Sequence, residues 1–90
     1  MSKEFIFETD QTSYDFCVLI AEEMVKNFDI SLEEAIKRIN FRWKKRGKIV
    51  GNSIVYHETV EYWAYDIYYG HDSGWWHRLG DPTLRPVLIN

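Results

Sequence analysis

The sequence predicts a mainly α-helical domain with a minor β component, an α+β class in which helices dominate. Apolar residues recur at intervals of three and four along most of the chain, as they do on the buried face of a helix. Three of the five glycines and both prolines fall within residues 70–90, which favours turns there. Fifteen aromatic residues among 90 supply large buried surfaces for a core. We therefore expect one compact domain over residues 1–90, with three helices, a short β-hairpin or edge strands, and a long C-terminal loop.

The N-terminal part of the chain predicts a short strand followed by the first helix. Phe5 and Phe7 share one side of the segment 3–8, a period of two that is typical of a strand. From Thr12 or Ser13, either of which suits an N-cap, apolar residues recur with helical spacing. The predicted buried stripe of this helix is Tyr14, Cys17, Ile20, Ala21, Met24, Val25 and Phe28.

The second helix has the clearest start and end. Ser31 and Glu34 form a capping-box pattern, in which the serine side chain accepts a hydrogen bond from the Glu34 amide. Gly47 ends the helix after a last turn rich in lysine and arginine, which favours the helix dipole. The predicted buried stripe is Leu32, Ala35, Ile36, Ile39 and Trp43.

The second half of the chain predicts a hairpin or irregular loop, a third helix and the C-terminal loop. Gly51 and Asn52 separate two β-branched pairs within residues 48–56, which indicates a small hairpin, although an irregular loop fits nearly as well. Helical spacing returns at about Glu58 and runs to Gly70. The loop that follows is expected to end in an edge strand over residues 87–89.

Aromatic side chains give the third helix two different faces. Val60, Trp63, Ala64 and Ile67 form one apolar face that suits a core. Tyrosines occupy the opposite face, and two tryptophans follow in the loop. Either the chain's own C-terminal loop covers these tyrosines, or they form a contact surface for a partner, most simply a second copy in a homodimer. The predicted partner-binding residues are Tyr62, Tyr65, Tyr69, Trp75 and Trp76.

A basic stretch offers an alternative binding surface on the second helix. Phe41 lies away from the buried stripe, and cationic side chains stand three and four residues from it in both directions. An aromatic ring among cations can stack on a base while the cations contact phosphates, so an anion or single-stranded nucleic acid is the alternative partner. The residues of this alternative are Lys37, Arg38, Phe41, Lys44 and Lys45. The net charge of -3 argues against a generally basic nucleic-acid binder.

Histidine and acidic residues raise a third hypothesis, a small metal or hydrolytic site. Its residues would be His57, Glu61, His71 and His77. The spacing resembles no diagnostic ligand pattern, because Glu61 stands where the second histidine of an H-E-x-x-H helix would be. Histidines among aromatic residues are more often structural, so we expect no metal and no cofactor.

These observations favour a non-enzymatic interaction module that self-associates through its aromatic face. The single Cys17 excludes an internal disulfide and is expected to be a buried, inert thiol. The N-terminal residues lack the features of a signal peptide, and no apolar run approaches the ~20 residues that span a bilayer. We therefore expect a cytoplasmic protein with no membrane partner.

Overall fold

The computed structural model describes residues 5, 8–44, 48–49 and 58–89, and the statements below concern these residues. The first of its three α-helices is α1 (Gln11–Phe28). Its N-cap is Asp10, whose carboxylate accepts a hydrogen bond of 2.8 Å from the backbone N–H of Ser13. The prediction of Thr12 or Ser13 as the cap was therefore wrong, since a carboxylate before them satisfies the free N–H groups and also suits the helix dipole.

The second helix, α2 (Leu32–Trp43), begins at Ser31 as predicted. The Ser31 hydroxyl accepts a hydrogen bond of 3.0 Å from the Glu34 amide. The predicted stripe is correct at Ala35, Ile39 and Trp43, which are buried, but Leu32 is 50% exposed because it lies in the first turn, beyond the edge of the core.

The third helix, α3 (Val60–Tyr69), carries the predicted apolar face into the core. Thr59 caps it by accepting a hydrogen bond of 3.0 Å from the backbone N–H of Tyr62. Trp63, Ala64 and Ile67 are buried, as the helical spacing predicted. The helix stops at Gly70, whose φ of 86° is a backbone conformation that residues with a side chain rarely adopt.

The β component in the described residues is one short parallel pairing. Strand β1 (Glu8–Thr9) lies beside β2 (Lys48–Ile49), with Glu8 opposite Lys48. Most of the predicted N-terminal strand and the 50–56 part of the predicted hairpin lie outside the described residues. Within the described part, the partner of β2 is β1, which lies near the N-terminus of the chain.

The C-terminal segment is a loop with two short 3₁₀ helices, η2 (His71–Ser73) and η3 (Trp75–His77). Local hydrogen bonds stabilise the turn at Asp81, whose carboxylate accepts from the backbone N–H and hydroxyl of Thr83 and from the guanidinium of Arg78. These bonds, with those from Thr83 the largest cause, lower the pKa of the Asp81 carboxyl to about 2. The predicted strand over residues 87–89 was wrong. The backbone N–H of Val87 donates to the carbonyl of Tyr68 on α3, so the tail packs on a helix and not on a sheet edge.

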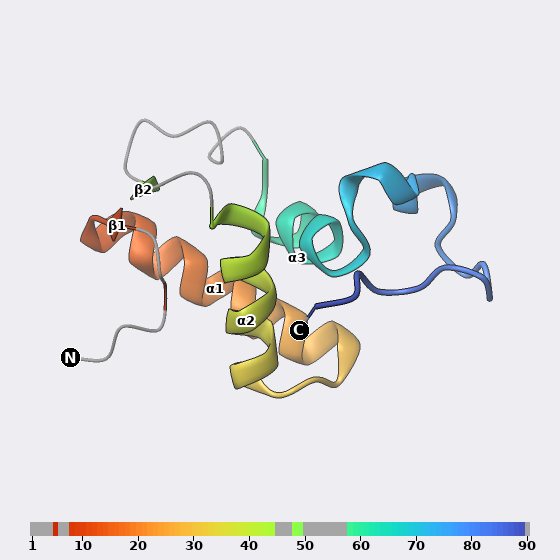
Figure 1. Ribbon diagram of the computed structural model, residues 1–90, viewed down its shortest axis with the longest axis horizontal. Coiled ribbons are helices and arrows are strands. Elements are labelled where there is room, and N and C mark those ends of the chain that lie inside the picture. The colour runs from red at the N-terminus through yellow and green to blue at the C-terminus, as the bar shows by residue number, and fades with distance from the viewer. Residues whose placement is uncertain (1–4, 6–7, 45–47, 50–57, 90) are drawn as a thin grey trace.

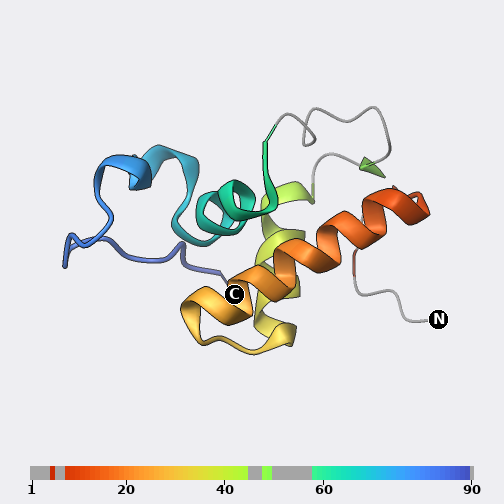
Figure 2. The same ribbon diagram turned by 180° about the vertical axis from the view of Figure 1, so that it is seen from behind.

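Figures 1 and 2 show how these elements are arranged. Helix α2 crosses in front of α1 in Figure 1, and α1 lies in front of α2 when the molecule is seen from behind. Helix α3 packs beside both, and the C-terminal segment extends from it to one end of the long axis before returning toward α2. The core between the helices contains Phe5, Cys17, Ile20, Ala21, Met24, Ala35, Ile39, Trp43, Trp63, Ala64 and Ile67. None of the described helices is long and apolar enough to span a membrane.

Candidate functional site

A fully buried carboxylate joins the C-terminal segment to two helices. Asp66 on α3 has an exposure of 0%, and its Oδ1 accepts a hydrogen bond of 2.7 Å from the indole N–H of Trp75. Its Oδ2 accepts one of 2.6 Å from the guanidinium of Arg42 on α2, and the Nδ1 atom of His71 lies 3.2 Å from Oδ1. Because a buried charge is tolerated only when it is paired and hydrogen-bonded, these three partners explain how Asp66 can be buried.

Arg42 is fixed by more than its ion pair. Its second guanidinium nitrogen donates to the backbone carbonyl of Asp66 at 3.1 Å, and the group lies 5.5 Å from the ring centre of Trp63. Among the described residues, no buried side-chain nitrogen or oxygen lacks a hydrogen-bond partner. The network around Asp66 is therefore satisfied, which favours one arrangement of α2, α3 and the two 3₁₀ helices.

The predicted tyrosine face is largely covered from within the chain. Phe28, at the end of α1, stacks on Tyr68 with ring centres 3.8 Å apart and meets Tyr65 and Tyr69 edge to face. Burial raises the pKa of the Tyr69 hydroxyl. The tyrosines are partly buried rather than freely exposed, and the intramolecular interpretation accounts for much of this face.

Trp75 covers the rest of the tyrosine face. It is only 8% exposed, and its ring stacks on Tyr65 at 5.3 Å between centres and contacts Tyr62 at 5.5 Å. Partial burial raises the pKa of the Tyr62 hydroxyl, and the negative charge of Asp66 acts in the same direction. Trp75 therefore acts as a lid on α3, anchored by its hydrogen bond to the carboxylate below.

Trp76 points the other way. It is 45% exposed, and its ring centre lies 5.3 Å from that of His71 and 5.7 Å from that of His77. Leu79, 57% exposed, follows three residues later. We call Trp76, His71, His77 and Leu79 the exposed aromatic surface. It lies in the C-terminal segment, drawn in blue at one end of the molecule in Figure 1.

A pocket lies beside this surface, between α2 and the end of α3. Its volume is about 450 Å³. Phe41, Arg42 and Tyr69 line one part of it and His71 another. The size suits a small ligand. The charge of Arg42 is already matched by Asp66, and the lining also includes the exposed carboxylate of Asp72.

The structure separates the residues of the predicted basic face. Lys37, Phe41 and Lys44 are exposed, and the Lys44 ammonium lies 4.9 Å from the ring centre of Phe41. Arg38 is only 8% exposed, and Lys45 lies outside the described residues. The surface available to an anion is therefore smaller than the sequence suggested.

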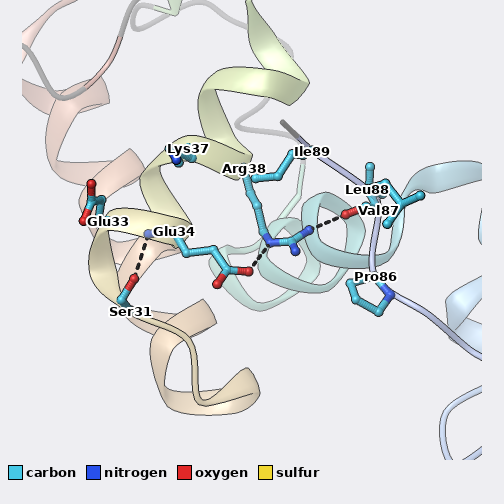
Figure 3. A pocket seen from close by; sticks show the side chains of 9 residues that line it. All are labelled: Ser31, Glu33, Glu34, Lys37, Arg38, Pro86, Val87, Leu88 and Ile89. Carbon is cyan, nitrogen blue, oxygen red and sulfur yellow. Dashed lines mark hydrogen bonds and ion pairs between the residues drawn. The ribbon is translucent and has the colours of Figure 1, made fainter.

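Arg38 serves the chain itself. Figure 3 shows its guanidinium between Glu34 and the C-terminal tail. It forms an ion pair of 2.9 Å with Glu34 and donates to the carbonyl of Val87 at 2.7 Å, while the ring of Tyr68 lies 4.9 Å from its central carbon. These contacts fix the tail across α2. Glu34, Arg38 and Val87 also line a pocket of about 430 Å³.

The metal hypothesis is not supported by the described residues. Among them, no group of three or more histidine, cysteine, aspartate and glutamate side chains could hold a metal ion. The Nδ1 atom of His71 contacts Asp66, and in the described part of the chain His71, Glu61 and His77 form no group of ligands. His57 lies outside the described residues.

Cys17 is buried at 0% exposure, as predicted. Burial raises the pKa of its thiol from the usual 9.0 to about 12. The thiol therefore stays protonated at neutral pH and is a poor nucleophile.

Sequence reasoning missed Asp66 and Arg42, the two charged residues at the centre of the network. One signal pointed to Asp66, because at 100° per residue it lies between Trp63 and Tyr62, at the boundary of the apolar face and the tyrosine face. An acidic residue in that position requires buried partners. Arg42 had no such signal, since it is one of seven basic residues in a short stretch.

Comparison with known proteins gave no match for this chain, whether among family models, curated proteins or solved structures.

Proposed function

We propose that this chain is a small, non-enzymatic interaction module that self-associates through its exposed aromatic surface. The observation that carries the proposal is the contrast among its four tryptophans. Trp43, Trp63 and Trp75 are 3%, 8% and 8% exposed, whereas Trp76 is 45% exposed. Tryptophan is enriched among the residues that dominate binding energy at interfaces, so an outward-facing indole on an ordered segment favours a contact role.

The neighbours of Trp76 support this role. Leu79 adds an exposed apolar side chain, and the rings of His71 and His77 flank the indole. An aromatic anchor with apolar and amphipathic neighbours resembles the centre of a protein interface more than it resembles a catalytic site.

The backbone beneath Trp76 is held in place before any partner arrives. Trp75 is anchored on Asp66 by a hydrogen bond of 2.7 Å and packs on Tyr62 and Tyr65. The surface is thus presented from a fixed segment, which lowers the entropy lost on binding. In this proposal the tyrosines and Trp75 support the contact, and Trp76 makes it.

A second copy of the chain is the partner that requires the fewest assumptions. A two-fold dimer needs only one self-complementary patch, and the side chains of Trp76 and Leu79 are uncharged, so they can meet their own equivalents without opposing like charges. Two-fold dimers are also the commonest assemblies of soluble proteins.

The test is the molar mass of the protein measured by light scattering across micromolar concentrations. The mass of the native chain is expected to rise with concentration from that of a monomer to at least that of a dimer. Trp76→Glu should weaken the dimer by about 2 kcal/mol, or roughly thirty-fold in its dissociation constant, because it removes the anchor and opposes two carboxylates. Tyr65→Glu is unsuitable, since Tyr65 contacts Phe28 and Trp75 inside the protomer.

Leu88→Glu is the matched control. Leu88 is 91% exposed on the tail, outside the aromatic surface, so this change adds the same charge elsewhere. It should leave the dissociation constant unchanged. Equal concentration dependence for Trp76→Glu and the native chain would contradict the proposal.

A further inference from the structure

We propose that the outer face of α1 binds the outer face of α2 in a second copy, with the two helices antiparallel. This contact is independent of the exposed aromatic surface and goes beyond the function proposed above. It rests on two exposed helix faces whose charges and apolar residues match in order and spacing.

The face on α1 has an apolar residue between acidic ones. Leu19 is 52% exposed, on the side of α1 away from its buried residues. It lines a groove of about 470 Å³ together with Val60 from the start of α3 and the acidic residue Glu61. Four exposed residues at helical spacing form the α1 face: Asp15, Leu19, Glu22 and Lys26.

The face on α2 has an aromatic residue between basic ones. Phe41 is 42% exposed, and the Lys44 ammonium lies 4.9 Å from the centre of its ring. The exposed residues at helical spacing that form the α2 face are Glu33, Lys37, Phe41 and Lys44.

The two faces complement each other when one helix is reversed. Along α1 the order is acidic, apolar, acidic, basic, and along reversed α2 it is basic, apolar, basic, acidic. With a rise of 1.5 Å per residue, the last three positions lie about 6, 10.5 and 16.5 Å from the first on α1, and about 4.5, 10.5 and 16.5 Å on α2. Leu19 then lies opposite Phe41, which can enter the groove beside it.

The charges on these faces are available for such a contact. Glu22 and Lys26 are four residues apart, as are Glu33 and Lys37, but neither pair forms an ion pair in the described part of the chain. Lysine and glutamate at the rim of an interface set its orientation and accelerate encounter, while the apolar residues at the centre supply the affinity.

The two faces cannot serve one another within a protomer. Figures 1 and 2 show α1 and α2 crossing one over the other. Because the buried residues of each helix face the core between them, the exposed α1 face and the exposed α2 face point away from each other. Association is therefore head to tail, and it extends beyond two copies unless a ring closes. The aromatic contact, by contrast, stops at a dimer.

A charge exchange in the Trp76→Glu background tests the contact without the aromatic dimer. One variant carries Asp15→Lys and Glu22→Lys, which makes both of its faces basic. The other carries Lys37→Glu and Lys44→Glu, which makes both of its faces acidic.

By light scattering at low salt, the Trp76→Glu parent should increase in mass with concentration, each variant alone should stay at the monomer mass, and their equimolar mixture should associate again. In 1 M salt, where the Debye length falls to about 3 Å, association of the parent should weaken at least tenfold.

Net charge alone also attracts the two variants, so the apolar centre provides the control. Adding Leu19→Ser to both variants should abolish association of the mixture, whereas adding Leu79→Ser to both should leave it intact, since Leu79 is 57% exposed in the C-terminal segment and belongs to neither face. Association of either variant alone, a mixture that stays monomeric, or a mixture that is indifferent to Leu19→Ser would overturn the proposal. Circular dichroism verifies the fold of each variant. If a variant unfolds, its charge reversals are replaced by neutral substitutions: Asp15→Asn with Glu22→Gln on α1, and Lys37→Gln with Lys44→Gln on α2. Each neutral pair is expected to weaken the parent's association at least tenfold. Because all arms carry Trp76→Glu, failure here leaves the aromatic dimer untouched.

Discussion

At the scale of single residues, the fold depends most on a charge that sequence reasoning did not select. Asp66 accepts hydrogen bonds from Arg42 and Trp75 and contacts His71, so one carboxylate holds α2, α3 and the C-terminal segment together. Removing one partner of a buried ion pair costs more than the pair contributes, because the remaining charge has no counterpart.

Asp66→Asn should therefore lower the free energy of unfolding by about 3 kcal/mol, the lower end of the range for a broken buried pair, because Arg42 keeps some solvent contact. Urea unfolding followed by circular dichroism measures this change. The control is Asp72→Asn, which alters an exposed carboxylate in η2 and should change stability by less than about 0.5 kcal/mol. Equal effects of the two substitutions would show that the network is not a determinant of the fold.

Periodicity predicts which helical residues face the core but not what covers the rest. It placed Trp63, Ala64 and Ile67 correctly, because a helix that docks on a core repeats every 3.6 residues. It could not separate Trp75 from Trp76, which are neighbours in a 3₁₀ turn with 8% and 45% exposure. That difference comes from a tertiary hydrogen bond to Asp66, which no local pattern records.

At the scale of elements, Gly70 makes the turn from α3 into the C-terminal segment and also leaves room for the tail. Its φ is 86°, and a Cβ placed on it would lie 2.9 Å from Cγ2 of Val87. The sequence predicted the helix end at Gly70 from the first of these properties. The close approach to Val87 depends on the return of the C-terminal tail 17 residues later, which only the fold reveals.

Gly70→Ala should lower stability by about 2 kcal/mol, since it combines backbone strain with a steric conflict. Gly80→Ala is the control, because Gly80 has a φ of 91° but open space around its Cβ position, and it should cost only about 1 kcal/mol. Thermal unfolding of both variants gives the comparison.

A double-mutant cycle identifies the steric part of this cost. Val87→Ala removes the methyl group that the new Cβ would meet, so its combination with Gly70→Ala should be less destabilising than the sum of the two changes. Simple additivity would mean that the tail does not lie against Gly70.

At the scale of the whole molecule, the sequence correctly indicated a small, mainly helical domain with three principal helices and a C-terminal loop. Capping residues and apolar stripes determine these features locally. The tail's position could not be predicted, because it depends on Arg38, which looked like part of a basic surface but donates to Val87 and pairs with Glu34. Charged residues are assigned to the surface by default, and their exceptions appear only in three dimensions.

At this scale the aromatic residues divide into those that build the protomer and Trp76, which we propose contacts a second copy. Trp75 is anchored on Asp66, and Trp76 extends outward from the next position. In an assembly through the exposed aromatic surface, only the second of these indoles changes its surroundings.

The most direct test is a dilution series of the ¹⁵N-labelled protein followed by NMR, in which the indole N–H groups of the four tryptophans give separate signals. We expect the Trp76 signal to shift over the concentration range in which the molar mass changes, while the Trp75 signal stays fixed by its hydrogen bond to Asp66. A Trp76 signal that does not move as the mass changes, or a protein that stays monomeric throughout, would contradict the account.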